Sequence, residues 1–324
     1  MRATSVALLA ASVLIPAAPG AASGPPPMSI YLRGPHDASM TAVAVPSGRV
    51  SVQPLPRLGG GDPPFTVAAV GGRLVYYARR AVGTAFTAAI APGATRARSL
   101  GGSWYFVPSA RPGRVWLALL DPRAADTDRR LAGVREVGVD GRPARRARHR
   151  PPAGMIVGAM REGLVISGAG LVVWDPVTGR TVWRPRGVLA APPGRTALVS
   201  RTPGGRALLF ARAARTSRGR IDPPAGYRFG TGGALSPDER TIAIPVVGRH
   251  GTRVAISDLG PRSRPLVAPA GGEGARLAWA PGGRWVVVAV PGRPLRAVDR
   301  GDGRVARLPS TAPARLADLV VAAP

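Results

Sequence analysis

One short unit recurs along this chain and limits its fold more than any other feature. A turn rich in Pro and Gly is followed by an arginine and then by an apolar run rich in Val, Ile and Trp. The copies span 235–244, 279–288, 201–210 and 110–117, with two copies that lack the proline at 70–77 and 161–166. Pro and Gly preset the backbone of a tight turn, and β-branched and aromatic residues favour strands. The unit therefore predicts a strand, a turn and a second strand.

The spacing of these units selects the architecture. Turn prolines stand at Pro112, Pro203, Pro237 and Pro281, and the turn at 162–163 divides the longest gap. The mean step is about 42 residues, the length of one four-stranded blade of a β-propeller. A helical repeat of that length would show apolar residues three and four apart, and this chain does not show them. We therefore predict an all-β fold, a single β-propeller of six or seven four-stranded blades.

A second signal follows the turns and supports the same fold. Three strands end in a small polar hairpin, at 172–182, 255–260 and 297–305, as expected for the third and fourth strands of a blade. The predicted blades span 65–100, 103–150, 154–187, 195–227, 228–268 and 275–309. The stretch 211–226 shows no clear strand pattern.

The two ends of the chain supply a further blade. Strand candidates at 29–32 and 41–52 precede the first predicted blade, and another at 315–323 follows the last. Pairing the two ends in one blade would close the ring and remove its sheet edges, which favours seven blades over six. Two or more independent β-sandwich domains are the alternative.

The repeat resembles a known family. The sequence Leu-Ser-Pro-Asp-Glu-Arg-Thr-Ile at 235–242 resembles the turn of TolB-type β-propellers, which are related to Trp-Asp-repeat propellers. In that family the turn usually reads Ser-Pro-Asp-Gly, so Glu239 replaces a glycine, and the unit at 279–286 carries Gly282 where Asp is usual. The resemblance implies a propeller and no catalytic residues. The family includes secreted and periplasmic binding or scaffold proteins.

The charge of the chain is strongly positive. All 45 basic residues are arginines, and they face 17 acids, for a net charge of +28. A GC-rich genome explains the excess of Arg, Ala, Gly and Pro without any selection for charge. Such a charge nevertheless produces a positive field and salt-sensitive association with polyanions. The chain contains no Cys, which excludes disulfides, thiolate catalysis and a lipid-modified N-terminal Cys.

The N-terminus has the pattern of an export signal. Arg2 precedes an apolar stretch over 6–18, and the small residues at 17–23 suit a signal peptidase. We predict a signal peptide over 1–23, a linker over 24–28 and the propeller domain over 29–324. No later segment is long and apolar enough to span a membrane. The mature protein is expected to be soluble, secreted or otherwise extracytoplasmic, and monomeric.

A search for catalytic groups finds no recognisable active site. The three histidines, His36, His149 and His250, lack partners spaced for a triad or a metal site, and no Gly-x-Ser-x-Gly motif occurs. A Walker loop needs Lys, which is missing. The carboxylate pair Asp126 and Asp128 is too sparse for a calcium loop. We therefore predict no catalytic residues, no metal and no cofactor.

The densest charge is a candidate anion-binding loop. It comprises Arg142, Arg145, Arg146, Arg148 and Arg150. Guanidinium groups suit phosphate and carboxylate, although a solvated loop between blades explains the same charges. No aromatic residues are interleaved with these arginines, so specific nucleic-acid binding is not expected.

Three functions follow from these features. The first is an exported, non-catalytic propeller that binds a protein, peptide or glycan, or acts as a scaffold, at or outside the cell envelope. The second is a hydrolase or lyase that uses carboxylates around the central channel. The third is an electrostatic adhesin for anionic envelope polymers, motivated by the net charge of +28.

Overall fold

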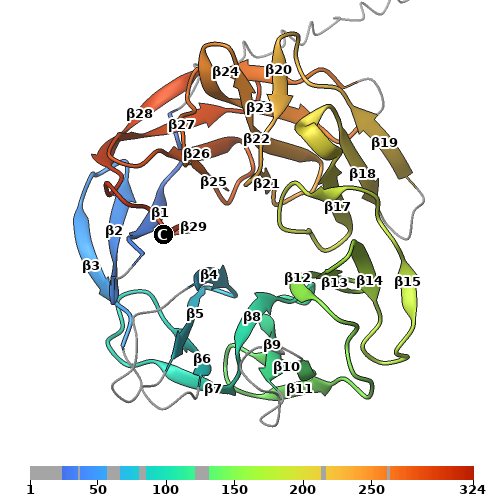
Figure 1. The fold of residues 1–324 in the computed structure, drawn as a ribbon. Helices are drawn as coiled ribbons and strands as arrows, with labels where there is room; N and C mark the ends of the chain where they lie inside the picture. Colours follow the sequence, from blue (N-terminus) through green and yellow to red (C-terminus); the bar gives the residue numbers. More distant parts are fainter. Residues whose placement is uncertain are drawn as a thin grey trace, which may run out of the picture.

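The structure is a closed ring of seven β-blades, which confirms the predicted β-propeller (Figure 1). It is a computed structural model that describes residues 24–35, 37–56, 66–79, 85–120, 131–212, 217–260 and 263–324. The predicted signal peptide lies outside the described residues, and the first strand begins at Met28. Within the described residues, no helix is long and apolar enough to cross a membrane.

The first three blades, numbered here by their place along the chain, are antiparallel sheets whose first strand lies nearest the axis. Blade 1 contains β29 (Asp318–Ala322), β1 (Met28–Arg33), β2 (Ser39–Val45) and β3 (Val50–Pro54). Blade 2 contains β4 (Thr66–Val70), β5 (Arg73–Arg79), β6 (Ala85–Ile90) and β7 (Arg98–Gly102). Blade 3 contains β8 (Tyr105–Pro108), β9 (Arg114–Leu120), β10 (Leu131–Gly138) and β11 (Pro143–Arg146).

The other four blades continue the ring with the same strand order. Blade 4 contains β12 (Met155–Met160), β13 (Gly163–Ser167), β14 (Leu171–Trp174) and β15 (Thr181–Trp183). Blade 5 contains β16 (Val188–Leu189), β17 (Ala197–Arg201), the 3₁₀ turn η1 (Pro203–Gly205), β18 (Leu208–Arg212) and β19 (Ser217–Ile221). Blade 6 contains β20 (Tyr227–Phe229), β21 (Ala234–Leu235), β22 (Thr241–Gly248), β23 (Gly251–Asp258) and β24 (Leu266–Ala268). Blade 7 contains β25 (Arg276–Trp279), β26 (Trp285–Ala289), β27 (Pro294–Asp299) and β28 (Val305–Thr311).

The two ends of the chain close the ring in blade 1, as predicted. β29 pairs with β1 in an antiparallel register that sets Ile30 opposite Val321. The fully buried Arg33 reinforces this pairing, because its Nε donates to Asp318 Oδ2 at 2.6 Å. Figure 1 shows the C-terminal end of the chain inside the ring beside β1.

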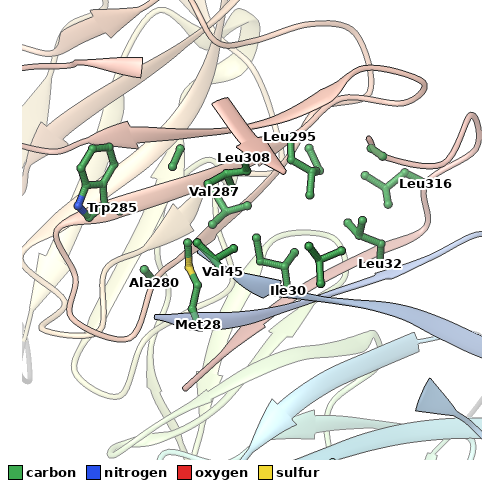
Figure 2. Close-up of a cluster of buried hydrophobic side chains, with 14 residues drawn as sticks. Met28, Ile30, Leu32, Val45, Ala280, Trp285, Val287, Leu295, Leu308 and Leu316 are labelled. Carbon is green, nitrogen blue, oxygen red and sulfur yellow. The ribbon is translucent and has the colours of Figure 1, made fainter. Parts of the chain in front are cut away.

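Apolar clusters fill the spaces between neighbouring blades, one at each of the seven junctions. In Figure 2, Met28, Ile30 and Leu32 of β1 face Val287 and Leu295 of blade 7. The second strand of a blade is covered on both sides, and every residue of β26 is buried, as its unbroken apolar run predicts. The ring is therefore held by side-chain packing between sheets as well as by strand pairing.

Two details of the predicted strand plan are wrong. The turn at Pro203 joins the second and third strands of blade 5, β17 and β18, whereas the other turns in the series join first and second strands. The equivalent turn of blade 5 is at 190–196, and β19 ends at Ile221, so this blade begins and ends earlier than 195–227. That turn, Pro192-Pro193-Gly194-Arg195, itself fits the repeat, and it stands only eleven residues before the turn at Pro203 that was chosen in its place. The candidate at 41–52 is likewise two strands, β2 and β3.

Candidate ligand-binding site

The five predicted arginines do not form one group. Arg142 lies in the turn between β10 and β11, where its Nε is 3.5 Å from Asp140 Oδ2. Arg145 and Arg146 belong to β11, the outermost strand of blade 3. Arg148 and Arg150 follow in the connection to blade 4. The sequence placed these residues on a single loop, whereas the structure distributes them over a turn, a strand and a connection.

Strand register separates Arg145 from Arg146. Arg145 stands opposite Glu136, and Arg146 stands opposite Arg135. Because successive side chains of a strand point to opposite faces of the sheet, the two neighbours face different blades. Trp116, opposite Glu136 on β9, packs in the cluster between blades 3 and 4, so Arg145 shares that side. Of the five arginines, Arg145 is therefore the one that lines the space toward blade 4.

The connection after β11 rests on blade 4. The Arg148 amide donates to the Pro176 carbonyl at 3.2 Å, and Arg150 Nε donates to the Leu131 carbonyl at 3.1 Å. The His149 ring packs so closely over Gly179 that a Cβ there would lie 2.5 Å from it. Gly179 also has φ +72°, a backbone conformation that favours glycine. These contacts fix the position of the last strand of blade 3 relative to the hairpin at 174–181.

A pocket of about 540 Å³ opens between blades 3 and 4. We call it the 3–4 pocket and define it by Arg111, Glu136, Arg145, Arg161, Asp175 and Arg195. These residues come from the turns between first and second strands, from the hairpins between third and fourth strands, and from the strand ends beside them. Its volume falls in the ~300–1,000 Å³ range of small-molecule sites.

Glu136 is the buried polar group of the 3–4 pocket. Its side chain is 2% exposed, and its Oε1 accepts a 2.5 Å hydrogen bond from the Ser109 hydroxyl. Its Oε2 has no hydrogen-bond donor among the described residues. The nearest cationic atoms, Nη1 of Arg111 and Nη1 of Arg114, are each 3.8 Å from that oxygen, beyond hydrogen-bond distance. Oε2 of the buried Glu136 carboxylate therefore remains a hydrogen-bond acceptor without a donor among the described residues.

Asp175 adds a second carboxylate, and its own turn holds it. The Val177 amide and the Thr178 hydroxyl donate to its two oxygens at 2.8 and 2.7 Å. Burial alone would raise the pKa of Asp175, but these donors and the charge of Arg145 outweigh burial and lower it below its usual range. Asp175 is therefore ionised at neutral pH and places negative charge beside the exposed Arg145.

The junction between blades 5 and 6 also carries a buried glutamate, at the position where the family turn usually has glycine. Glu239 has φ +56°, a conformation that costs energy for any residue except glycine. Its carboxylate crosses to the first turn of blade 5, where it accepts hydrogen bonds from the amides of Arg195, Thr196 and Ala197 and from the Thr196 hydroxyl. These four bonds compensate for the strained turn and tie the two blades together.

A cleft of about 700 Å³ lies on the same face between blades 6 and 7. Arg300 of blade 7 bridges two aspartates of blade 6, at 3.1 Å from Asp238 Oδ2 and 3.0 Å from Asp258 Oδ1. Arg284 pairs with Asp299 at 2.9 Å inside blade 7. Arg300 therefore links blades 6 and 7, and the acids around this cleft are used in ion pairs.

The histidines and the aspartate pair that the sequence analysis considered do not form a site of this kind among the described residues. His36, Asp126 and Asp128 lie outside the described residues. Within the described ranges, no three or more His, Asp or Glu side chains gather in a group that could hold a metal ion. His149 packs over a hairpin, as described above, and His250 lies in the turn between β22 and β23.

The sequence analysis missed Glu136, although one signal for it was present. Arg135 and Glu136 are adjacent in a strand, so their side chains point to opposite faces. In the middle of a blade both faces are covered, so two consecutive charged residues require at least one of them to be buried. The partners of Glu136 are Ser109, Arg111 and Arg114, which lie at the first turn of the same blade and far from it in sequence, so spacing alone does not reveal them.

The comparisons with known proteins agree on the fold. No protein-family model matches this chain, and no curated protein matches it. A candidate 6-phosphogluconolactonase from Bacteroides uniformis aligns over 91% of this chain and 99% of its own, with 10% identity and a TM-score of 0.56. AztD from Citrobacter koseri aligns over 91% and 98%, with 10% identity and a TM-score of 0.54. TolB from Acinetobacter baumannii aligns over 92% and 67%, with 14% identity and a TM-score of 0.48.

The chain is a seven-bladed β-propeller. That statement concerns architecture, because at such identities structural likeness shows the fold alone. The propeller fold that the Ser-Pro-Asp turn implied is confirmed. What the chain binds has to be argued from its own residues.

Proposed function

We propose that this protein is an exported, non-catalytic β-propeller that binds a protein, peptide or glycan at or outside the cell envelope. The observation that carries the proposal is the 3–4 pocket, where a buried carboxylate oxygen of Glu136 lacks a hydrogen-bond donor among the described residues. Buried polar groups are almost always satisfied in folded proteins, and exceptions require an explanation. A ligand that donates a hydrogen bond to Glu136 provides one.

The setting of this pocket supports binding more than catalysis. Glu136 and Asp175 are embedded among arginines and are held by the Ser109 and Thr178 hydroxyls. A pair of catalytic carboxylates needs environments that push their pKa values apart, with one raised into the neutral range. The pKa of Asp175 is instead lowered, which favours a fixed negative charge over a proton donor.

Export is the second part of the proposal and rests on residues 1–23. Their charged start, apolar centre and small-residue end are the features of a cleaved signal. Expression of the full chain, followed by mass spectrometry of the extracytoplasmic fraction, tests this part. We expect a new N-terminus near Gly24. Recovery of the chain inside the cell with its first 23 residues intact would refute export.

Binding is tested with the mature protein in calorimetric titrations against peptides, neutral glycans and acidic glycans. We expect at least one of these ligands to bind saturably and with an affinity that Glu136→Gln changes. Turnover of any of them by the purified protein, abolished by a point substitution, would favour the hydrolase or lyase alternative.

The net charge of +28 supports a competing function, adhesion to anionic envelope polymers. Adhesion of that kind depends on counterion release, so it weakens steeply between low and physiological salt and does not depend on one buried residue. Binding that disappears with salt and is indifferent to Glu136→Gln would establish adhesion in place of the pocket.

A further inference from the structure

Among the inter-blade spaces of the described structure, the 3–4 pocket has a chemical requirement that its own residues do not meet. Around the cleft between blades 6 and 7, Asp238, Asp258 and Asp299 all have arginine partners within 3.1 Å. In the 3–4 pocket, the closest approach of an arginine to Glu136 Oε2 is 3.8 Å. In the cleft between blades 6 and 7 the carboxylates are paired with arginines. In the 3–4 pocket one carboxylate oxygen is still available as a hydrogen-bond acceptor.

The environment of Glu136 restricts what can donate to it. Nη1 of Arg111 and Nη1 of Arg114 each lie 3.8 Å from its Oε2, and their charges offset that of the carboxylate. A ligand ammonium placed on the same oxygen would be repelled by both guanidinium groups. A hydroxyl donates a hydrogen bond without carrying charge, and the positive surroundings do not oppose it. The donor that fits Glu136 is therefore an uncharged O–H or N–H group, and a hydroxyl is the one that a sugar supplies.

The rest of the pocket has an excess of positive charge. Four arginines line it with three acids, Glu136, Asp175 and Glu162, and Arg114 adds a further cation next to Glu136. Arg145, Arg161 and Arg195 are exposed, so their guanidinium groups are accessible from the solvent. Planar guanidinium forks bind carboxylate and phosphate groups well. A ligand held by these arginines carries an anionic group near its hydroxyl.

Trp116 contributes a third element. It stands opposite Glu136 in the sheet and lines the same pocket. An indole ring offers apolar surface beside a polar group, which suits a ligand with both hydroxyl groups and C–H surfaces. A sugar has both, whereas an unsubstituted dicarboxylate such as succinate has no hydroxyl and an amino acid brings an ammonium.

We propose that the 3–4 pocket binds an acidic sugar, a sugar unit that carries a carboxylate or a phosphate. One hydroxyl donates to Glu136 Oε2, and the anionic group pairs with Arg145 and its neighbours at the rim. This inference rests on the proposed binding function and specifies its ligand class. A uronic-acid polymer and a sugar phosphate share this chemistry, and the experiment separates them.

The test is calorimetry with four probes on the mature protein: an oligomer of glucuronic acid, glucose 6-phosphate, an oligomer of glucose and succinate. The glucose oligomer lacks the anion, and succinate lacks the hydroxyl. We expect one of the two acidic sugars to bind at least about tenfold more tightly than both controls. Equal binding of succinate, equal binding of the glucose oligomer, or no binding by either acidic sugar would overturn the inference.

Glu136→Gln gives the sharpest readout. Because this variant loses a hydrogen bond to a charged acceptor, its affinity for the acidic sugar should fall by about tenfold to a hundredfold. A site that attracted anions through charge alone would behave in the opposite way, because removal of a carboxylate makes the pocket more positive. Tighter binding by this variant would therefore contradict a hydroxyl on Glu136. A thermal melt shows whether the variant is folded.

Arg145 and Arg146 form a matched pair with equal charge and adjacent positions. We expect Arg145→Ala to lower the affinity for the acidic sugar about tenfold. Arg146→Ala should change that affinity less than twofold, since Arg146 faces blade 2. Equal losses in both variants would indicate a bulk charge effect and overturn the assignment. If a peptide or neutral glycan binds and depends on Glu136, the binding function stands and the acidic-sugar inference alone falls.

Discussion

The junction between blades 5 and 6 and the junction between blades 3 and 4 each bury a glutamate on the same face of the ring, with opposite results. Glu239 places both carboxylate oxygens on the backbone of the neighbouring blade and receives four hydrogen bonds there. Among the described residues Glu136 receives one, from Ser109 of its own blade; its second oxygen has no hydrogen-bond donor, and its side chain lines the 3–4 pocket.

The difference shows how a repeat fold separates stability from recognition. A carboxylate satisfied by two backbone segments fixes their distance, so it acts as a cross-link. A carboxylate satisfied by its own blade leaves the junction without such a link and retains hydrogen-bonding capacity. The ring thus contains one junction closed by its glutamate and one whose glutamate we propose as the acceptor for a ligand.

The largest expected effect is a contrast between Glu239→Gln and Glu136→Gln. At position 239 the amide nitrogen of Gln would face backbone N–H donors, so we expect a loss of about 2–3 kcal/mol in unfolding free energy. At position 136 Gln keeps the bond to Ser109 and meets no N–H donor at hydrogen-bond distance, so the loss should be about 1 kcal/mol or less. Urea unfolding of both variants checks this. Equal losses would remove the distinction between the two junctions.

Gly194→Ala tests the close approach that the cross-link requires. A Cβ at this position would lie 2.7 Å from Cδ of Glu239, so the carboxylate would have to move away from the amides it binds. We expect a loss of about 1–2 kcal/mol, measured by urea unfolding. Gly282→Ala, in a turn with no atom within 4 Å of the added Cβ, is the control. A smaller loss in Gly194→Ala than in the control would show that the contact is not tight.

Arg300→Ala tests whether exposed ion pairs between blades 6 and 7 act as a weaker version of the same cross-link. The pairs with Asp238 and Asp258 are solvent-accessible, so we expect a loss of about 1 kcal/mol or less at low salt. That loss should shrink in about 1 M salt, where exposed charges are screened. Unfolding midpoints at the two salt concentrations give the answer. A larger, salt-independent loss would mean that Arg300 acts through packing.

The smallest effect concerns the pH dependence of Asp238. Burial alone would raise its pKa, but the Ser236 hydroxyl, the Arg240 amide and Arg300 lower it to about 2. A carboxyl with a lower pKa in the fold than in the unfolded chain stabilises the fold above about pH 4, and that contribution is lost as the pH falls toward 2. Because Asp238 is 45% exposed, we expect less than about 1 kcal/mol. Stability curves of wild type and Asp238→Asn should converge at acid pH. Parallel curves from pH 7 to pH 2 would contradict this.

Local chemistry was sufficient to predict most of the fold. The turns at 236–240 and 280–284 have the residues that tight turns require, and the strands after them are apolar on both faces, which identified blades 6 and 7. Blade 5 was misplaced because two turns of the same composition stand close together, at 192–195 and 203–206, and the second joins β17 and β18. Ring closure followed from the strand candidates at the two ends.

The candidate site was less predictable, for a physical reason. Arginine density indicated blade 3, but the face on which each side chain lies depends on the register between β10 and β11, which shifts at 136–137. A shift of one residue exchanges the two faces, so Arg145 and Arg146 cannot be distinguished by composition. Glu136 becomes notable only once the turn of its own blade and the hairpin of the next are in place.

A crystal structure of the mature protein with the tighter-binding of the two acidic sugars tests the central claim most directly. We predict a sugar hydroxyl within hydrogen-bond distance of Glu136 Oε2, the anionic group on Arg145, and Glu239 unchanged on the turn of blade 5. A sugar bound elsewhere on the arginine-rich surface, with Glu136 Oε2 accepting from Arg111 or Arg114 instead, would contradict it.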